Sequence, residues 1–127
     1  MKPLLDTAKQ IALPALFGMV HVKALPGTPF NTHEMDKIVE IAVAEAEQFQ
    51  IAGFDGIILE NMHDRPYLKC EVGPEIVAGM TRVACEVKRR VGAAFPVGIQ
   101  ILAGANIEAL AVAMISGCEF IRAEGCV

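Results

Sequence analysis

Ionisable and amide side chains gather directly after a short apolar run at residues 57–59. Within the next six positions the chain carries Glu60, Asn61, His63, Asp64 and Arg65, and a proline follows. The apolar run predicts a buried parallel strand. In parallel α/β proteins, side chains just past the carboxyl ends of the strands line the ligand site. We therefore expect chemistry here, and the alternative is a solvated loop with a structural ion pair.

Polar residues also follow the three other apolar runs of the chain. The further candidates are His21 and Lys23 after the first run, Gln100 and Asn106 at the third, and Arg122 and Glu124 at the fourth. The interiors of these runs carry almost no polar side chains. The pattern predicts a polar edge where all four strands end, with these residues in substrate binding or catalysis.

Two of these residues have chemistry that is readily assigned. The pKa of a histidine lies near working pH, so His21 is a candidate general acid or base. Its alternative is a core histidine that is hydrogen-bonded to the backbone. The guanidinium of Arg122 is suited to holding an anionic group of a substrate.

The acidic residues after the second run have three interpretations. Glu60 and Asp64 could act as a catalytic carboxylate pair, or they could hold a divalent cation together with Asn61. The third interpretation is a salt bridge from Glu60 to Arg122 or Lys23. The sequence does not choose between them, and it identifies no cofactor.

Composition and missing motifs exclude several classes of function. The net charge of −4 disfavours nucleic-acid binding, and no apolar run approaches the length of a membrane span. The three histidines form no H-x-x-x-H pair, and the four cysteines form no C-x-x-C pair. No secretory signal is visible in residues 1–13, which predicts a cytoplasmic protein with reduced thiols, with unusual mitochondrial import as an open alternative.

The elements that position these residues alternate between strands and helices. Strands are expected at 16–22, 57–59, 96–102 and 119–123. We expect the first helix to be capped by Asn31, with Glu34 in capping-box register, the second to begin at Gly73-Pro74-Glu75, and the third to be capped by Asn106. Gly53, Gly92 and Gly117 are expected to end them.

Each predicted helix has an apolar stripe with a helical period, which we expect to face the sheet. In the first helix the stripe is Met35, Ile38, Val39, Ala42, Ala46 and Phe49; in the second, Ile76, Met80, Val83, Ala84, Val87 and Val91; in the third, Ile107, Leu110, Ala111 and Met114. The basic cluster Lys88-Arg89-Arg90 falls in the last turn of the second helix, where cations complement the helix dipole.

The order β-α-β-α-β-α-β predicts four parallel strands with three intervening helices. This α/β pattern is that of the first half of a TIM-type (β/α)8 barrel, and a small flavodoxin-like doubly wound sheet is the competing fold. The hydrophobic content of 54% suits a part of a larger barrel. If the chain is not longer, we expect it to self-associate.

Four blocks of the sequence resemble the BtpA/SgcQ family, which includes photosystem I biogenesis proteins of cyanobacteria. They are Gly18-Met19-Val20-His21, Leu25-Pro26-Gly27-Thr28-Pro29, the segment 53–61 and Phe120-Ile121-Arg122. The resemblance implies a ribulose-phosphate-binding-type (β/α)8 barrel of about twice this length, with residues 1–127 as its N-terminal part. It also implies a site at His21, Glu60, Asn61, Asp64 and Arg122.

Three functions follow as hypotheses. The first is an enzyme that acts on a small anionic metabolite, phosphorylated or not, by acid–base chemistry. The second is a non-catalytic assembly or stability factor for a larger complex. The third is an inactive truncated product.

Overall fold

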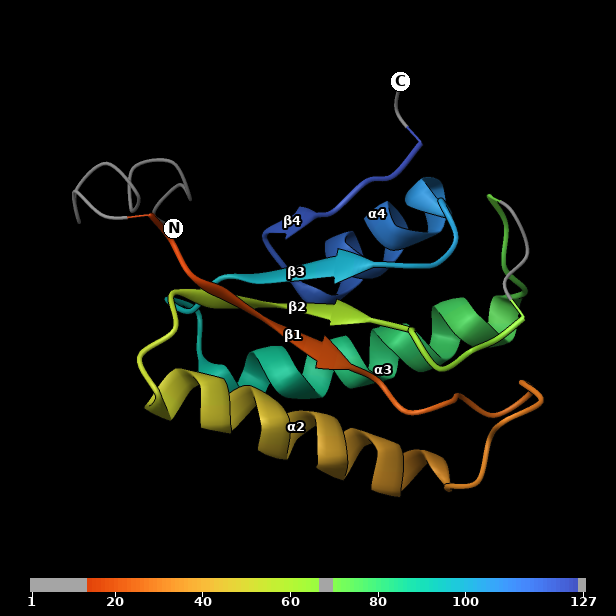
Figure 1. Ribbon diagram of the computed structural model, residues 1–127, viewed down its shortest axis with the longest axis horizontal. Helices are drawn as coiled ribbons and strands as arrows, with labels where there is room; N and C mark the ends of the chain where they lie inside the picture. Colours follow the sequence, from red (N-terminus) through yellow and green to blue (C-terminus); the bar gives the residue numbers. More distant parts are fainter. Residues whose placement is uncertain (1–13, 67–69, 126–127) are drawn as a thin grey trace.

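A computed structural model describes residues 14–66 and 70–125. Its helices and strands alternate along the chain as expected (Figure 1). In chain order they are β1 (Phe17–His21), α2 (Met35–Ile51), β2 (Gly56–Glu60), α3 (Pro74–Val91), β3 (Val97–Gln100), α4 (Asn106–Ser116) and β4 (Phe120–Ile121). The strands are shorter than predicted at β1, β3 and β4, where the flanking residues already belong to the loops.

The four strands form one parallel sheet in the order β1-β2-β3-β4. α3 packs between α2 and α4, and the three helices form a layer on one face of the sheet (Figure 1). A doubly wound sheet reverses its strand order at a switch point, and this sheet does not. The parallel α/β prediction is confirmed, and the arrangement is consistent with half of a β/α barrel.

The core lies between the sheet and the helix layer. All six stripe residues of α3 are buried, as predicted, and the buried residues of α2 are Ile38, Val39, Ala42, Val43 and Ala46. No helix in the described part of the chain is long and apolar enough to cross a membrane.

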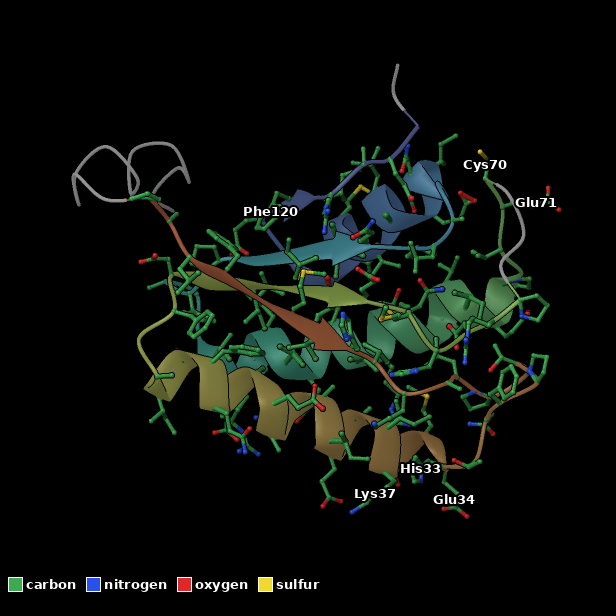
Figure 2. The ribbon with its side chains drawn as sticks, in the orientation of Figure 1. His33, Glu34, Lys37, Cys70, Glu71 and Phe120 are labelled. Atoms are coloured by element: carbon green, nitrogen blue, oxygen red, sulfur yellow. The ribbon has the colours of Figure 1, made fainter. Side chains whose placement is uncertain are left out.

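Glycines end the helices at the predicted places, but two predicted N-caps are wrong. Gly53, Gly92 and Gly117 have φ values of 87°, 91° and 77°, which a residue without Cβ adopts without strain. α2 begins only after Glu34, and the Asn31 side chain instead donates to the carbonyls of Ala24 and His33 in the preceding loop. His33 and Glu34 lie just before the helix (Figure 2).

Asn106 is the first residue of α4, and its N-cap is Ala105. The side chain of Asn106 donates to the Glu124 carbonyl at 2.9 Å, and its Oδ1 accepts from the Glu124 N–H at 3.2 Å. A contact with a loop 18 residues away therefore takes the place of the predicted local cap.

The predicted stripe of α4 is also wrong. Ile107, Leu110 and Met114 are 79%, 55% and 76% exposed, and the buried residues are Ala109, Val112 and Ala113. Because α4 is apolar on nearly every side, its sequence does not choose a face. The small residues let the helix lie close to the sheet and to α3, which leaves the large side chains outside.

Two aromatic rings cover the face of the sheet opposite the helices, at the end where the strands begin. Phe17 and Phe120 lie edge to face with ring centroids 5.6 Å apart, although two strands separate them. Gly56 and Gly98 make this contact possible, since a Cβ at either position would lie 2.4 or 2.3 Å from a phenylalanine ring. We call these two rings the aromatic floor; they lie on the same face as the carboxyl ends of the strands, but toward the start of the strands.

Candidate functional site

Four predicted residues lie together at the carboxyl end of the sheet. His21 is paired in register with Glu60, and Glu60 with Gln100. Arg122 directly follows β4 and its N–H donates to the Ile99 carbonyl at 2.9 Å. We call His21, Glu60, Gln100 and Arg122 the strand-end quartet.

The quartet lies on the face away from the helices. Side chains alternate along a strand, and a Cβ at Gly18 would meet Phe49 of α2. Residues 17, 19 and 21 of β1 therefore point to the opposite face. Gly56 and Gly98 lie against the two rings of the aromatic floor, and Phe120 is one of those rings. Glu60, Gln100 and Arg122 each lie two or four residues further along the same strands, so they share that face.

Burial differs across the quartet. Glu60 and Gln100 are 8% and 6% exposed, His21 is half-buried and Arg122 is exposed. The Gln100 Oε1 atom is buried and accepts no hydrogen bond from the described residues. Within the same described ranges, no ion pair joins Glu60 to Arg122 or Lys23. The arrangement places an imidazole, a carboxylate, an amide and a guanidinium at one edge without using them in ion pairs with each other.

His63 belongs to the ionisable segment after the second strand, but we assigned it no role of its own from the sequence. Its ring lies edge to face with that of His21, with the centroids 6.4 Å apart. The signal was its place in the ionisable segment after β2, but only the folded chain brings it to β1. Lys23, the predicted cation after β1, is half-buried in the loop that follows this strand.

The other predicted residues join neighbouring loops. Asp64 Oδ1 accepts the Leu25 N–H at 2.7 Å, which links the loops after β2 and β1. Asn61 Oδ1 accepts the Leu102 N–H at 2.7 Å, which links the loops after β2 and β3.

The loop after β3 is linked to the segment after β4 in the same way. Glu124 Oε1 accepts the Gly104 N–H at 2.7 Å, beside the paired contacts between Glu124 and Asn106. These loop contacts position the backbone around the quartet.

Cation binding by Glu60, Asp64 and Asn61 remains a prediction. One side-chain oxygen of Asp64 and the amide oxygen of Asn61 already accept backbone N–H groups. Residues 14–66 and 70–125 contain no group of three or more His, Cys, Asp or Glu side chains arranged to hold a metal ion.

Asp64 is 6% exposed, and burial raises the pKa of its carboxyl group. The hydrogen bond from Leu25 and the nearby Asn61 and Thr28 side chains oppose this shift without cancelling it. A carboxyl group with a raised pKa binds more protons in the folded than in the unfolded protein. The free energy of unfolding therefore falls as pH rises from the ordinary aspartate range through the raised pKa.

We expect Asp64→Asn to remove this pH dependence. Asparagine keeps an oxygen for the Leu25 N–H, so the variant should lose less stability than the natural chain between about pH 4 and neutrality. Asp64→Ala should cost about 1–3 kcal/mol, because the Leu25 N–H loses its acceptor. Urea unfolding across this pH range measures both effects, with the exposed Asp36→Asn as control. Parallel pH profiles of the natural chain and Asp64→Asn would contradict the assignment.

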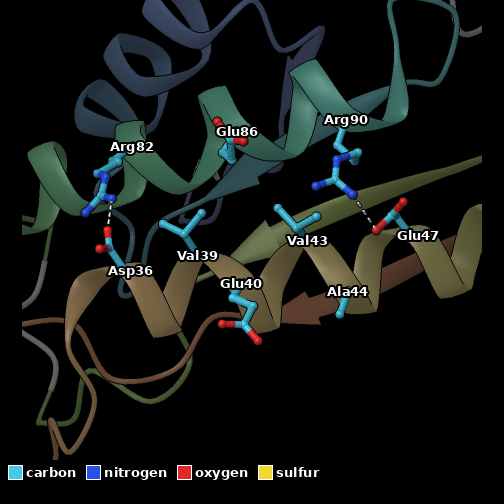
Figure 3. Close-up of a pocket in the computed structure, with 9 residues that line it drawn as sticks. All are labelled: Asp36, Val39, Glu40, Val43, Ala44, Glu47, Arg82, Glu86 and Arg90. Carbon is cyan, nitrogen blue, oxygen red and sulfur yellow. Dashed lines mark hydrogen bonds and ion pairs between the residues drawn. The ribbon is translucent and has the colours of Figure 1, made fainter.

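Hollows of the described part of the chain also lie outside the quartet. A cavity of about 150 Å³ lies between the loops after β1 and β2 and the start of α3, and Thr28, Asn61 and Asp64 contribute to its lining. A groove of about 540 Å³ runs between α2 and α3 on the outer surface (Figure 3).

The outer groove has an apolar floor of Val39 and Val43. Arg82 and Arg90 of α3 cross it to Asp36 and Glu47 of α2, at 3.2 Å in the second pair (Figure 3). Exposed ion pairs of this kind contribute little stability. The groove lies on the helix layer, away from the strand ends, so the larger hollow is not where the candidate residues meet.

Comparison with known proteins gives a consistent family assignment. Residues 13–126 match the model of the BtpA family. An uncharacterised mitochondrial protein of Caenorhabditis elegans is 50% identical over 115 residues, which are 88% of this chain and 42% of that protein. An uncharacterised protein of Pyrococcus horikoshii is 44% identical over 84% of this chain and 40% of its own length.

The photosystem I biogenesis protein BtpA of Synechocystis is 36% identical over 107 residues, which are 84% of this chain and 37% of that protein. The chain thus spans about two-fifths of the length of the curated relatives that it matches. No solved structure matches it.

Proposed function

Because the chain belongs to the BtpA family, we propose that it forms the first half of a ribulose-phosphate-binding-type (β/α)8 barrel that acts on a small anionic metabolite by acid–base chemistry. The observation that carries this proposal is the strand-end quartet. Sequential parallel strands, a single helix layer and the longer relatives support the half-barrel. In such barrels the carboxyl ends of the strands form the active site.

Each member of the quartet has a role in the proposed chemistry. Arg122, which is exposed and directly follows β4, binds the anionic group of the substrate, either a phosphate or a carboxylate. Glu60 or His21 moves the proton, since the two residues are paired in register at the ends of neighbouring strands and face the same site. The unpaired Gln100 Oε1 accepts a hydrogen bond from a hydroxyl or amine of the substrate. Asn61, Asp64, Asn106 and Glu124 hold the loops around it, and Lys23 adds a second cation.

The anion-binding step is testable with inorganic phosphate. We expect phosphate to shift the NMR signals of residues around Arg122, and Arg122→Ala to weaken this binding at least tenfold, which corresponds to about 1.4 kcal/mol. Arg89→Ala is the matched control, because Arg89 is an exposed arginine of α3 that pairs with Glu86. Equal losses in the two variants, or shifts confined to the helix layer, would contradict the proposal.

The proton-transfer step is tested in cells that depend on the protein. Glu60→Gln keeps the shape of the side chain and removes its ability to accept a proton, so it should fail to replace the natural chain. A folded Glu60→Gln protein that restores the normal phenotype would contradict catalysis by Glu60.

The second candidate function is assembly or stabilisation of a larger complex. It is favoured by the name of the Synechocystis relative, which is a photosystem I biogenesis protein. An assembly factor should tolerate Glu60→Gln and Arg122→Ala and should depend on its outer surface instead. The same cell experiment thus separates the two functions.

The compartment is part of the proposal. We place the chain in the cytoplasm, while the name of the nematode relative assigns that protein to mitochondria. Cell fractionation distinguishes the two compartments.

A further inference from the structure

The strand-end quartet forms an ordered row across the sheet. His21 is paired in register with Glu60, and Glu60 with Gln100. The pairing of β3 with β4 continues this register and places Arg122 beside Gln100. Neighbouring strands lie about 4.8 Å apart, so the row places Gln100 about 5 Å and Glu60 about 10 Å from Arg122 along the sheet. Gln100 therefore lies between the anion-binding residue and both candidates for proton transfer.

The side-chain amide of Gln100 has an oxygen that no described residue satisfies. Gln100 is 6% exposed, and its Oε1 atom accepts no hydrogen bond within residues 14–66 and 70–125. Burial of an amide oxygen without a donor costs free energy, because the oxygen has given up its hydrogen bonds with water. The neighbouring Glu60 cannot supply a donor while it is ionised, since a carboxylate only accepts. A ligand that donates a hydrogen bond would remove this cost.

The polar groups of the row differ in what they offer a ligand. Ionised Glu60 only accepts hydrogen bonds and Arg122 only donates them, whereas the Gln100 amide does both. A hydroxyl group matches the amide, because it can donate to Oε1 and at the same time accept from a neighbouring donor. A methylene group at this point would leave Oε1 without a hydrogen bond. The row is therefore suited to a ligand with a hydroxyl group over Gln100.

We propose that Gln100 is a specificity-determining residue that selects small anions with a hydroxyl group between the anionic group and the reacting atom. This inference rests on the proposed function and adds the chemical class of the substrate, a hydroxylated phosphate ester or carboxylate. Arg122 holds the anionic group, the hydroxyl lies over Gln100, and the reacting atom reaches Glu60 or His21 beyond it. A site built to hydrogen-bond a hydroxyl group rejects the analogue that lacks it.

Two phosphate esters of equal chain length test the proposal. Glycerol 3-phosphate carries hydroxyl groups on its carbon chain, and n-propyl phosphate carries none. Titration of the natural chain with each ester, followed by NMR, gives the two dissociation constants. We expect glycerol 3-phosphate to bind at least tenfold more tightly. Equal affinities of the natural chain for the two esters would overturn the inference.

A variant without the amide shows whether Gln100 causes the preference. Gln100→Leu keeps a similar side-chain volume and removes the acceptor, so the ratio of the two affinities should fall to about one. Gln48→Leu is the matched control, because Gln48 is an exposed glutamine of α2 in the helix layer, and it should keep the natural ratio. A variant that merely contains fewer folded molecules weakens both esters alike and leaves the ratio unchanged. A Gln100→Leu protein that keeps the preference would overturn the inference.

Gln100→Glu is the converse variant. It keeps an acceptor at the same place, so it should keep the preference for the hydroxylated ester, although its negative charge weakens the binding of both. Because it introduces no apolar side chain, it decides the question if Gln100→Leu fails to fold. Loss of the preference in a folded Gln100→Glu protein would overturn the role of the acceptor.

Inorganic phosphate separates this inference from the proposed function. If phosphate binds at Arg122 and the two esters bind equally, the anion-binding proposal stands and the role of Gln100 is overturned. If neither phosphate nor either ester binds, the proposed function and the inference fail together. Phosphate binding at Arg122 together with a preference that Gln100→Leu abolishes supports both.

Discussion

Replacing Lys88 by methionine is expected to destabilise the protein by about 3–5 kcal/mol. The Lys88 ammonium pairs with Glu119 at the end of the sheet opposite the quartet, and the two side chains are only 11% and 9% exposed. Lys88 Nζ also donates to the Phe95 carbonyl at 2.7 Å, and Glu119 Oε2 accepts the Val97 N–H at 2.7 Å. Methionine fills similar space but leaves the Glu119 carboxylate buried without its cation.

Urea unfolding of three variants isolates this effect. Arg89→Met removes an exposed cation of the same helix turn, which pairs with Glu86, and should change stability by no more than about 0.5 kcal/mol. The double variant Lys88→Met with Glu119→Gln should recover part of the loss, because no unpaired charge remains. Equal losses of unfolding free energy for Lys88→Met and Arg89→Met would show that the buried pair contributes no more stability than the exposed one.

Replacing Leu25 by alanine is expected to cost about 2–5 kcal/mol and to loosen the loop after β1. Leu25 is fully buried, and it packs so closely on α3 that a Cβ at Gly79 would lie 3.1 Å from its Cδ2 atom. Its N–H donates to Asp64, and its carbonyl accepts from the N–H and the hydroxyl of Thr28. The side chain thus anchors a loop that carries Lys23 close to the quartet.

The loss should appear in both stability and local exchange. Urea unfolding gives the free energy, and amide hydrogen exchange should become faster at Leu25 and Thr28 than at residues of β3. Leu16→Ala is the control, because Leu16 is 57% exposed and should lose much less stability. A Leu25→Ala protein with unchanged exchange at Thr28 would show that the loop is held by other contacts.

Local sequence signals predicted most of the elements correctly. The α3 stripe, the Gly73-Pro74 start and the glycines after each helix depend on residues within one or two turns of each other, and the structure confirms them. The same reasoning placed polar residues at the strand ends. Strand alternation then determined that His21, Glu60, Gln100 and Arg122 share a face once the register was known.

Predictions failed where a residue had a second possible contact that competed with the predicted one. Asn31 and Asn106 suit helix caps, but the Asn31 amide donates to carbonyls within its own loop, and the Asn106 amide donates to the Glu124 carbonyl in a separate loop. On α4 the periodic pattern marked the large apolar residues, whereas close packing selected Ala109, Val112 and Ala113. At Asn106 and on α4 the deciding energy came from a contact between segments far apart in the chain.

The sequence by itself determined the order of the elements, their parallel arrangement and the edge at which polar groups collect. It did so because helix periodicity, strand alternation and glycine conformation are local properties of the chain. Only the tertiary structure decided which polar groups are free for chemistry and which hold the backbone. Asp64 reaches Leu25 and Asn61 reaches Leu102 across about 40 residues of chain, and such distant contacts form only when the parallel strands bring their loops to one edge.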